Sequence, residues 1–270
     1  MCKDCGCGEP KDKHRKDAAH GGKKNHMHQH DGHWHSHDDD HDHEHKHEHS
    51  HHNEESRTVS VASKVLAAND EIAGQNRKWL AERGVIALNL ISSPGSGKTA
   101  LLEKTLELLK DNLPCAVIVG DQRTDNDARR LSGRGAPVKQ IETYSSCHLS
   151  AEHIAKVLPE IVTPGIKLLF IENVGNLVCP AAFDLGEHCK IALLSTPEGE
   201  DKPVKYPVLF SEAAVVLITK TDLAPHLDWE AAKCREHIRS VHPGAFIFEL
   251  SAKTGEGMNA WIDYLKSLNS

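Results

Sequence analysis

The most informative stretch of the chain reads IALNLISSPGSGKT and covers residues 86–99. Ile86 to Ile91 predict a buried strand, and the residues that follow Thr99 predict a helix. In the turn between them, glycines let backbone N–H groups approach phosphate oxygens, Lys98 can reach the β and γ phosphates, and Thr99 can ligate Mg²⁺. Ser92 stands where the general pattern has glycine, so the turn there must form without one. The stretch predicts a phosphate-binding loop (P-loop), formed by Gly95, Ser96, Gly97, Lys98 and Thr99.

From Val85 to the C-terminus, apolar β-rich runs alternate with helical patterns. Strands that are apolar throughout and separated by helices form parallel sheets with both faces covered. The sequence therefore predicts an α/β fold, with a mostly parallel sheet covered by helices on both faces, over residues 85–270. The predicted strands lie at 86–91, 115–119, 167–171, 191–194, 215–219 and 246–250, and helices at 100–111, 229–241 and 258–268.

Residues 58–84 have the pattern of one amphipathic helix. Gly84 follows the last apolar residue, as a glycine does at a helix C-terminus. We expect a helical segment that precedes the P-loop domain. The apolar positions, which recur at about seven-residue intervals, are Val65, Leu66, Ile72, Trp79 and Leu80.

Residues 1–57 have the composition of a metal-binding tail. Between His14 and His52 the sequence holds fifteen of the 21 histidines and almost nothing apolar except Met27 and Trp34. Such a stretch buries too little surface to offset its ordering entropy, so we expect it to be disordered without metal and to hold several divalent ions. A purification tag and a solubilising or pH-responsive tail are the alternatives.

Three cysteines crowd into the first seven residues, in the motif Cys2-x-x-Cys5-Gly6-Cys7. Three thiolates this close together can converge on one soft or borderline metal ion, and the glycine permits tight wrapping. A fourth ligand would come from the terminal amine or a tail histidine. Disordered reactive thiols are the alternative.

Acidic residues at predicted strand ends are candidates for the Mg²⁺ of a bound nucleotide. Glu172 ends the strand at 167–171 and is followed closely by Gly175, whose N–H can meet the γ phosphate. Asp121 follows another strand and is a second candidate, with Asp125 and Asp127 as weaker ones. An ordinary acid at a strand end is the alternative for Glu172.

Two loops after the last strands fit recognition of guanine. Asp222 can accept hydrogen bonds from N1 and N2 of guanine, the Lys220 stem can cover the ring, and the Ala252 N–H can meet O6, with Ser251 and Lys253 beside it. Adenine would leave these groups unpaired, so the sequence favours GTP. Thr219 stands where the usual pattern has asparagine, which we expect to weaken the tie between this loop and the P-loop.

A second metal site is suggested by Cys147-His148 and the distant Cys179. These are three ligands of an incomplete site, which a second chain could complete. Buried structural residues are the alternative. Cys179 lies seven residues beyond Glu172, so nucleotide state could control the site. The other cysteines in this domain are expected to be core thiols, namely Cys115, Cys189 and Cys234.

Composition excludes several classes of function. A formal net charge of -7 and 4% aromatic residues disfavour a general nucleic-acid-binding surface. The longest apolar runs are too short to span a bilayer, and the N-terminus lacks a signal-peptide core, so we expect a cytosolic protein with no membrane insertion. In a reducing cytosol, cysteines serve as metal ligands or packed thiols more often than as disulfides.

Together these motifs resemble the family of nickel-incorporating GTPases of hydrogenase maturation, relatives of the urease accessory GTPase. The resemblance covers the cysteine motif, the histidine-rich insert and nearly everything from Thr58 onward. The most specific stretches are 92–99, 120–122, 126–128, 171–180, 198–203 and 205–207.

The resemblance implies a P-loop GTPase with slow hydrolysis that forms a homodimer on binding GTP and Mg²⁺. Cys147, His148 and Cys179 match the family's nickel or zinc site near the dimer interface, and the N-terminal cysteines match its tight Ni²⁺ site. Members deliver nickel to the large subunit of nickel-iron hydrogenase with a small zinc-containing (Zn²⁺) partner protein. The catalytic candidates are then Lys98, Thr99, Asp121 and Glu172.

Three other functions compete with delivery of nickel. A nickel-storage protein would explain the histidine tail. A urease accessory GTPase would explain the nucleotide motifs, but that relative is expected to carry Cys-Pro-His where this chain has Cys179-Pro180-Ala181. A P-loop kinase would not require the guanine-binding residues at 222 and 251–253.

Overall fold

A computed structural model describes residues 28–30, 33–35, 52–121, 125–144 and 146–269. Seven parallel strands form one sheet in the order β5-β4-β6-β3-β7-β8-β9. The predicted α/β class is confirmed. The strands are β3 (Ile86–Ser92), β4 (Cys115–Asp121), β5 (Val138–Glu142), β6 (Leu168–Glu172), β7 (Cys189–Ser195), β8 (Ala213–Thr219) and β9 (Phe246–Glu249).

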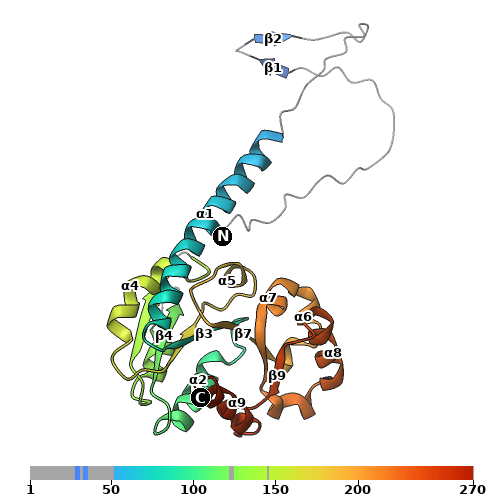
Figure 1. The fold of residues 1–270 in the computed structure, drawn as a ribbon. Helices are drawn as coiled ribbons and strands as arrows, with labels where there is room; N and C mark the ends of the chain where they lie inside the picture. The colour runs from blue at the N-terminus through green and yellow to red at the C-terminus, as the bar shows by residue number, and fades with distance from the viewer. Residues whose placement is uncertain (1–27, 31–32, 36–51, 122–124, 145, 270) are drawn as a thin grey trace.

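Helices cover both faces of the sheet (Figure 1). The side chains of Leu88, Phe170 and Leu193 pack on one face with α2 and α9, whereas their strand neighbours Leu169 and Ala192 pack on the other. The central strands are therefore buried on both sides, as a parallel sheet requires. The helices are α1 (His52–Ala81), α2 (Lys98–Leu109), α3 (Asn126–Leu131), α4 (Ala151–Ile161), α5 (Cys179–Ala182), α6 (Lys202–Lys205), α7 (Pro207–Glu212), α8 (Ala231–Val241) and α9 (Met258–Ser267).

Edge strand β5 was not among the predicted strands. Its sequence VKQIE mixes charged and apolar residues, and only Ile141 is buried. An edge strand with one neighbour needs no continuous apolar run, so the pattern that identifies the central strands does not identify it.

Helix α1 begins six residues before the predicted segment, and Figure 1 shows its N-terminal part extending away from the sheet. Two buried amides attach its other half to the body. Asn69 accepts a hydrogen bond from the Ala151 N–H, and Asn76 donates to the carbonyls of Ala151 and Leu185. The helix is thereby joined to the start of α4.

Within the histidine-rich segment, His28–His30 (β1) and His33–His35 (β2) pair as antiparallel strands. The expectation of disorder for the tail as a whole stays a prediction. Alternating His-x-His on both sides of Asp31-Gly32 is a typical hairpin sequence, and the composition argument did not consider it. The other residues of the predicted tail sites, including Cys2, Cys5 and Cys7, lie outside the described residues.

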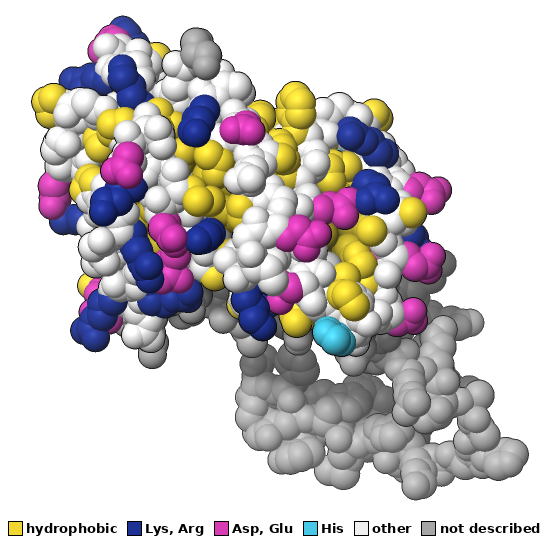
Figure 2. All heavy atoms as spheres, turned by 90° about the horizontal axis from the view of Figure 1, so that it is seen from below, with side chains coloured by type: hydrophobic (Ala, Val, Ile, Leu, Met, Phe, Trp, Pro, Cys, Tyr) yellow, Lys and Arg dark blue, Asp and Glu magenta, His cyan; other side chains and the backbone are white. Residues whose placement is uncertain are grey.

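The face shown in Figure 2 carries lysine and arginine interspersed with acidic and hydrophobic side chains. It has no continuous basic region of the kind that holds a nucleic-acid backbone. Among the helices that the structure describes, none has the length and apolar character needed to cross a membrane.

Candidate functional site: a phosphate cavity, a base pocket and a thiolate-imidazole group

The P-loop joins β3 to α2 and adopts its turn through two glycines. Gly95 and Gly97 have φ angles of 76° and 97°, in the left-handed region that side chains disfavour. Ser92 needs no such freedom because it is the last residue of β3. Its buried hydroxyl instead accepts a hydrogen bond from Lys98 Nζ at 2.8 Å. The departure from glycine at this position therefore does not disturb the loop.

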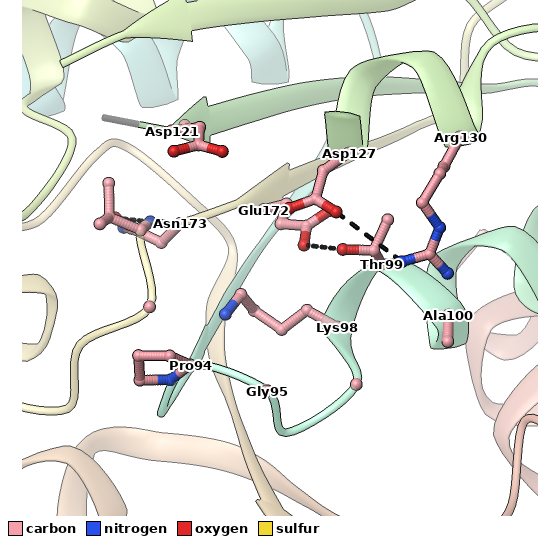
Figure 3. Close-up of a pocket in the computed structure, with 14 residues that line it drawn as sticks. Pro94, Gly95, Lys98, Thr99, Ala100, Asp121, Asp127, Arg130, Glu172 and Asn173 are labelled. Atoms are coloured by element: carbon pink, nitrogen blue, oxygen red, sulfur yellow. Dashed lines mark hydrogen bonds and ion pairs between the residues drawn. The ribbon is translucent and has the colours of Figure 1, made fainter. Parts of the chain in front are cut away.

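A cavity of about 470 Å³ opens above the P-loop and gathers the predicted phosphate residues (Figure 3). Thr99 donates from its hydroxyl to Glu172 Oε1 at 2.7 Å. The other carboxylate oxygen of Glu172, Oε2, is buried and has no hydrogen-bond partner in the described part of the chain. Asp121 and Gly175 also line this cavity.

Burial sets the ionisation of the two charged groups at the centre of this cavity. Burial raises the pKa of Glu172 to about 7, although Lys98 and the Thr99 hydrogen bond oppose the shift. Burial also lowers the pKa of the Lys98 amine, while nearby carboxylates, first Glu172, raise it. The cavity therefore holds a carboxyl group that can ionise near neutral pH beside a buried amine.

Helix α3 adds residues that the sequence did not single out or ranked low. Arg130 lines the phosphate cavity and lies 3.8 Å from Asp127, which lines it too. Asp125 is not among the lining residues and instead pairs with Arg129 at 2.7 Å. The α3 sequence NDARRL is short and has only two apolar residues, Ala128 and Leu131, which are too few to define the period from which its inward face could be assigned.

A second cavity, of about 300 Å³, adjoins the P-loop and contains the predicted base-recognition residues. Ser251 Oγ donates to Asp222 Oδ1 at 2.6 Å, which fixes the carboxylate that would read the base. Lys220 Nζ donates to the Gly95 carbonyl at 2.6 Å. Ala252 and Lys253 line the same cavity.

Thr219 ties the base loop to the P-loop although it stands where the usual pattern has asparagine. Its hydroxyl donates to the Ser96 carbonyl at 2.7 Å in a buried position. Thr219 ends β8 beside the P-loop, so its short side chain reaches the carbonyl that a longer amide would be expected to meet. The threonine preserves the connection through a different donor.

A further support for the P-loop is Glu198, whose role the sequence did not reveal. It accepts hydrogen bonds from the backbone N–H and the hydroxyl of Ser195, at 2.8 and 2.6 Å. Although burial raises the pKa of Glu198, the hydrogen bonds from Ser195 and the nearby hydroxyls of Ser93 and Ser96 of the P-loop bring it below its usual range. The Glu198 carboxylate is therefore ionised near neutral pH and lies next to the serines of the P-loop.

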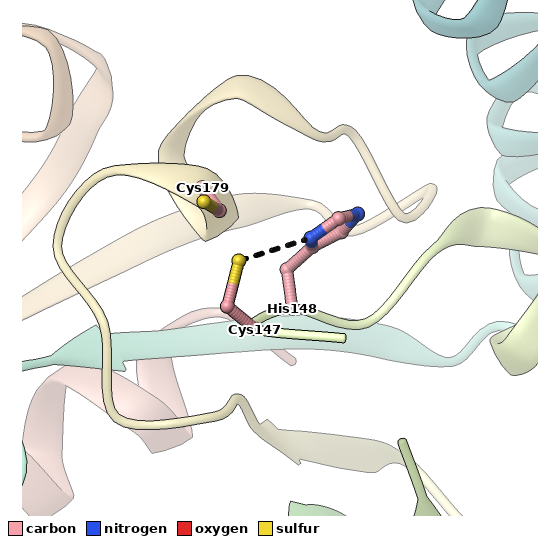
Figure 4. A group of neighbouring side chains, drawn as sticks. All are labelled: Cys147, His148 and Cys179. Carbon is pink, nitrogen blue, oxygen red and sulfur yellow. Dashed lines mark hydrogen bonds between the residues drawn. The ribbon is translucent and has the colours of Figure 1, made fainter. Parts of the chain in front are cut away.

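The structure brings together Cys147, His148 and Cys179, with ligand atoms within 4.8 Å of one another (Figure 4). Cys147 Sγ lies 3.8 Å from His148 Nδ1, and the His148 ring stacks on Phe183 with centroids 3.9 Å apart. Two thiols and an imidazole at this separation suit nickel or zinc, and tetrahedral coordination would need one more ligand.

The remaining thiols of the domain have the character of packed side chains. Burial raises the pKa of Cys115 and of Cys234 to about 12, and that of Cys189 to about 11. Because a metal ligand is a thiolate, these protonated groups are poor ligands near neutral pH.

The segment 172–179 connects the phosphate cavity to the metal ligands. It starts at Glu172, passes Val174 and Gly175 on the cavity wall, and ends at Cys179, the first residue of α5. The Gly175 backbone packs closely on the P-loop, since a Cβ added there would lie 3.0 Å from Pro94. Both sites thus share one short piece of chain.

Comparisons with known proteins agree with this arrangement. Residues 86–249 match the family described as "CobW/HypB/UreG, nucleotide-binding domain". The chain is 49% identical over 213 residues to the hydrogenase maturation factor HypB of Escherichia coli K12, covering 79% of this chain and 73% of that protein.

Two solved structures share both the fold and substantial sequence identity. HypB of Archaeoglobus fulgidus gives a TM-score of 0.72 at 36% identity, over 76% of this chain and all of that one. HypB of Helicobacter pylori, solved in complex with nickel, gives 0.71 at 37% identity, over 75% of this chain and 95% of that one. The chain therefore belongs to the CobW/HypB/UreG family and, within it, to the hydrogenase maturation factors of the HypB type.

Proposed function

We propose that this protein is a GTP-hydrolysing nickel metallochaperone that helps insert nickel into the large subunit of nickel-iron hydrogenase. The observation that supports this most strongly is that residues 172–179 run from the phosphate cavity to the metal-ligand group of Cys147, His148 and Cys179. A change at the terminal phosphate can therefore reach a metal ligand through eight residues of chain. The relative solved with nickel supports the choice of cargo.

In the proposed reaction, water attacks the γ phosphorus of GTP while the bond to the β–γ bridging oxygen breaks, giving GDP and phosphate. The Lys98 ammonium and the P-loop N–H groups stabilise the charge that develops on the phosphoryl oxygens. Thr99 and Glu172 offer the oxygen ligands that Mg²⁺ prefers, and the unpartnered Glu172 Oε2 fits such a role. Bound Mg²⁺ would neutralise phosphate charge.

In the proposed cycle, metal loading, dimer formation and partner binding depend on parts of the protein outside the phosphate cavity. Cys2, Cys5 and Cys7 would bind Ni²⁺ tightly, and the histidine tail would store it. GTP binding would form a homodimer, and hydrolysis would reset it. A small zinc-containing maturation protein and the hydrogenase large-subunit precursor would be the partners, in the cytoplasm.

Replacing either metal-binding cysteine is expected to remove nickel from the internal site. In full-length protein whose Cys2, Cys5 and Cys7 are serine, Cys147→Ser or Cys179→Ser should weaken Ni²⁺ binding by about 100-fold or more, because even groups that only orient a ligand contribute 10- to 100-fold. The measurement is nickel-thiolate absorption across chelator-buffered Ni²⁺ concentrations. Cys189→Ser, which removes a protonated thiol, is the matched control; equal losses in all three variants would contradict the assignment.

Binding of Mg²⁺ with GTP is expected to tighten as pH rises toward 7. The Glu172 carboxyl must be ionised to bind the ion, and its pKa is about 7 in the protein without ligand. Binding therefore releases a proton below pH 7, and affinity should fall by about tenfold per pH unit there and level off above. Calorimetry from pH 5.5 to 8.5 measures this, and Glu172→Gln should show a flat profile at weaker affinity. A flat profile in the unchanged protein would remove Glu172 from the site.

Nickel storage is the second candidate function, favoured by the fifteen histidines between His14 and His52. Storage predicts that deleting residues 14–52 abolishes the cellular phenotype while the P-loop is dispensable. Delivery predicts the reverse, with the tail mattering only when nickel is scarce. Hydrogenase activity of the two variants at low and high nickel separates these functions.

A further inference from the structure

Two consecutive residues at the end of β6 serve opposite faces of the sheet. Glu172 accepts a hydrogen bond from the Thr99 hydroxyl of α2. Asn173 Oδ1 accepts hydrogen bonds from two backbone N–H groups, that of Leu149 at 3.2 Å and that of Val174 at 2.9 Å. Side chains of successive residues in an extended strand point to opposite faces, and the Asn173 N–H still bonds to the Leu90 carbonyl of β3. Leu149 directly follows the metal-binding pair 147–148, so Asn173 bridges the metal loop and the wall of the phosphate cavity.

The orientation of the Asn173 amide is held by a buried polar chain. Asn173 Nδ2 donates to Asn89 Oδ1 at 3.2 Å, Asn89 Nδ2 donates to Glu187 Oε1 at 3.1 Å, and Glu187 Oε2 accepts the Leu185 N–H at 2.6 Å. The side chains of Asn89, Asn173 and Glu187 are at most 5% exposed. Turning the Asn173 amide over would set its NH₂ group against two N–H donors, which is costly without water. Its oxygen is therefore committed to Leu149 and Val174.

The backbone on both sides of Asn173 is closely packed. A Cβ added at Gly120, which lines the phosphate cavity, would lie 2.8 Å from the Leu149 side chain, so β4 and the metal loop are in close contact. On the other side, Gly175 is pressed against Pro94. Dense interiors respond to a local shift by moving as a unit rather than by deforming gradually. A shift of Val174 and Gly175 toward a terminal phosphate would thus disturb the shared Asn173 oxygen.

We propose that Asn173 is the positioning residue that couples nucleotide state to the metal site. When Val174 and Gly175 respond to the γ phosphate, the Asn173 oxygen changes its hold on the Leu149 N–H and so resets the adjacent Cys147-His148 ligands relative to Cys179. This inference rests on the proposed function, since it names the residue through which nucleotide-dependent metal binding acts. Asn173 itself lines the phosphate cavity beside Val174 and Gly175, but in this role it acts by orienting the backbone of Leu149 and Val174.

The test measures coupling rather than activity. Full-length protein with Cys2, Cys5 and Cys7 changed to serine is titrated with Ni²⁺, with nickel-thiolate absorption as readout, once with GDP and once with Mg²⁺ and a non-hydrolysable GTP analogue. The ratio of the two dissociation constants is expected to differ from 1 by about fivefold or more. Reciprocity requires Ni²⁺ to change the relative affinity for the two nucleotides by the same factor.

Asn173→Ala should bring that ratio to within about twofold of 1. Asn173→Asp keeps an oxygen for both N–H groups and, when protonated in this buried position, a donor for Asn89 Oδ1, so it should preserve the ratio and act as the rescuing variant. Asn173→Ser is too short to reach Leu149 and repeats the test should the alanine variant not fold. Thr105→Val removes a hydrogen bond to Trp261 from a similarly buried side chain that contacts no member of this polar chain, and should leave the ratio unchanged.

The outcomes separate this inference from the proposed function. A ratio that persists in Asn173→Ala or Asn173→Ser overturns the role of Asn173 and leaves nucleotide-controlled metal binding intact. A ratio of 1 in the protein with native Asn173 overturns both. Loss of the ratio in Thr105→Val as well shows a general loss of packing and also overturns the specific role.

Discussion

Replacing Lys98 with alanine is expected to lower the rate of GTP hydrolysis by about 10²- to 10³-fold, the usual effect of removing one donor to transition-state charge. The Lys98 ammonium is buried at the floor of the phosphate cavity, where water cannot substitute for it. Its present partners, Ser92 and the nearby carboxylate of Glu172, do not supply positive charge. Phosphate release from GTP under single-turnover conditions measures the loss.

Lys104→Ala is the matched control for Lys98→Ala. Lys104 lies on the same helix and pairs with Glu107 at 3.0 Å, so its loss should change the rate by less than about twofold. The same pair of variants tests delivery against storage in cells, because only delivery makes hydrogenase maturation depend on Lys98. Hydrolysis that survives in Lys98→Ala would contradict the proposed reaction.

Asp222→Asn is expected to exchange guanine for xanthine as the preferred base. In the proposed complex Asp222 would accept hydrogen bonds from N1 and N2 of guanine, whereas the NH₂ group of an asparagine would face the N2 donor of guanine without an acceptor. GTP affinity should fall by about 10³-fold. Xanthine carries a carbonyl at C2, which the new NH₂ group can meet, so XTP should bind in its place. Ser251 can still donate to the remaining oxygen, which keeps the side chain in position.

Displacement of a fluorescent nucleotide by GTP and by XTP measures this exchange. Asp228→Asn removes an exposed carboxylate a few residues along the same loop and should alter neither affinity. Loss of both nucleotides in Asp222→Asn, without gain for XTP, would show that the residue supports the loop rather than reads the base.

Much of the fold follows from sequence because the central strands carry unbroken apolar runs. β3, β4, β6, β7, β8 and β9 all form where such runs occur, and the P-loop forms between β3 and α2 as expected. β5 could not be found in this way, since an edge strand tolerates Lys139 and Gln140. The pairing of β1 with β2 was likewise not predicted, because composition alone does not reveal a short alternating pattern.

The site was predictable where residue type alone indicates chemistry. Thiol, imidazole, carboxylate and P-loop residues could be chosen from the sequence, and the parallel sheet brings its strand ends to one edge, where these residues meet. Asn173, Asn89 and Arg130 could not be chosen, since amides and arginines are common in many surroundings. Their importance depends on which face of a strand or helix they occupy, which only the packed structure shows.

One consequence for handling the protein comes from the edge at which the chain ends. Leu268 and Asn269, just past α9, lie beside Gly84, Pro114 and Lys167, at the starts of the central strands. The phosphate cavity, the base pocket and the three metal ligands lie at the opposite edge. Fluorophores, surface tethers or fused domains therefore belong at the C-terminus, where they stand a full sheet length away from nucleotide and cargo and leave the amino-terminal extension free of added sequence.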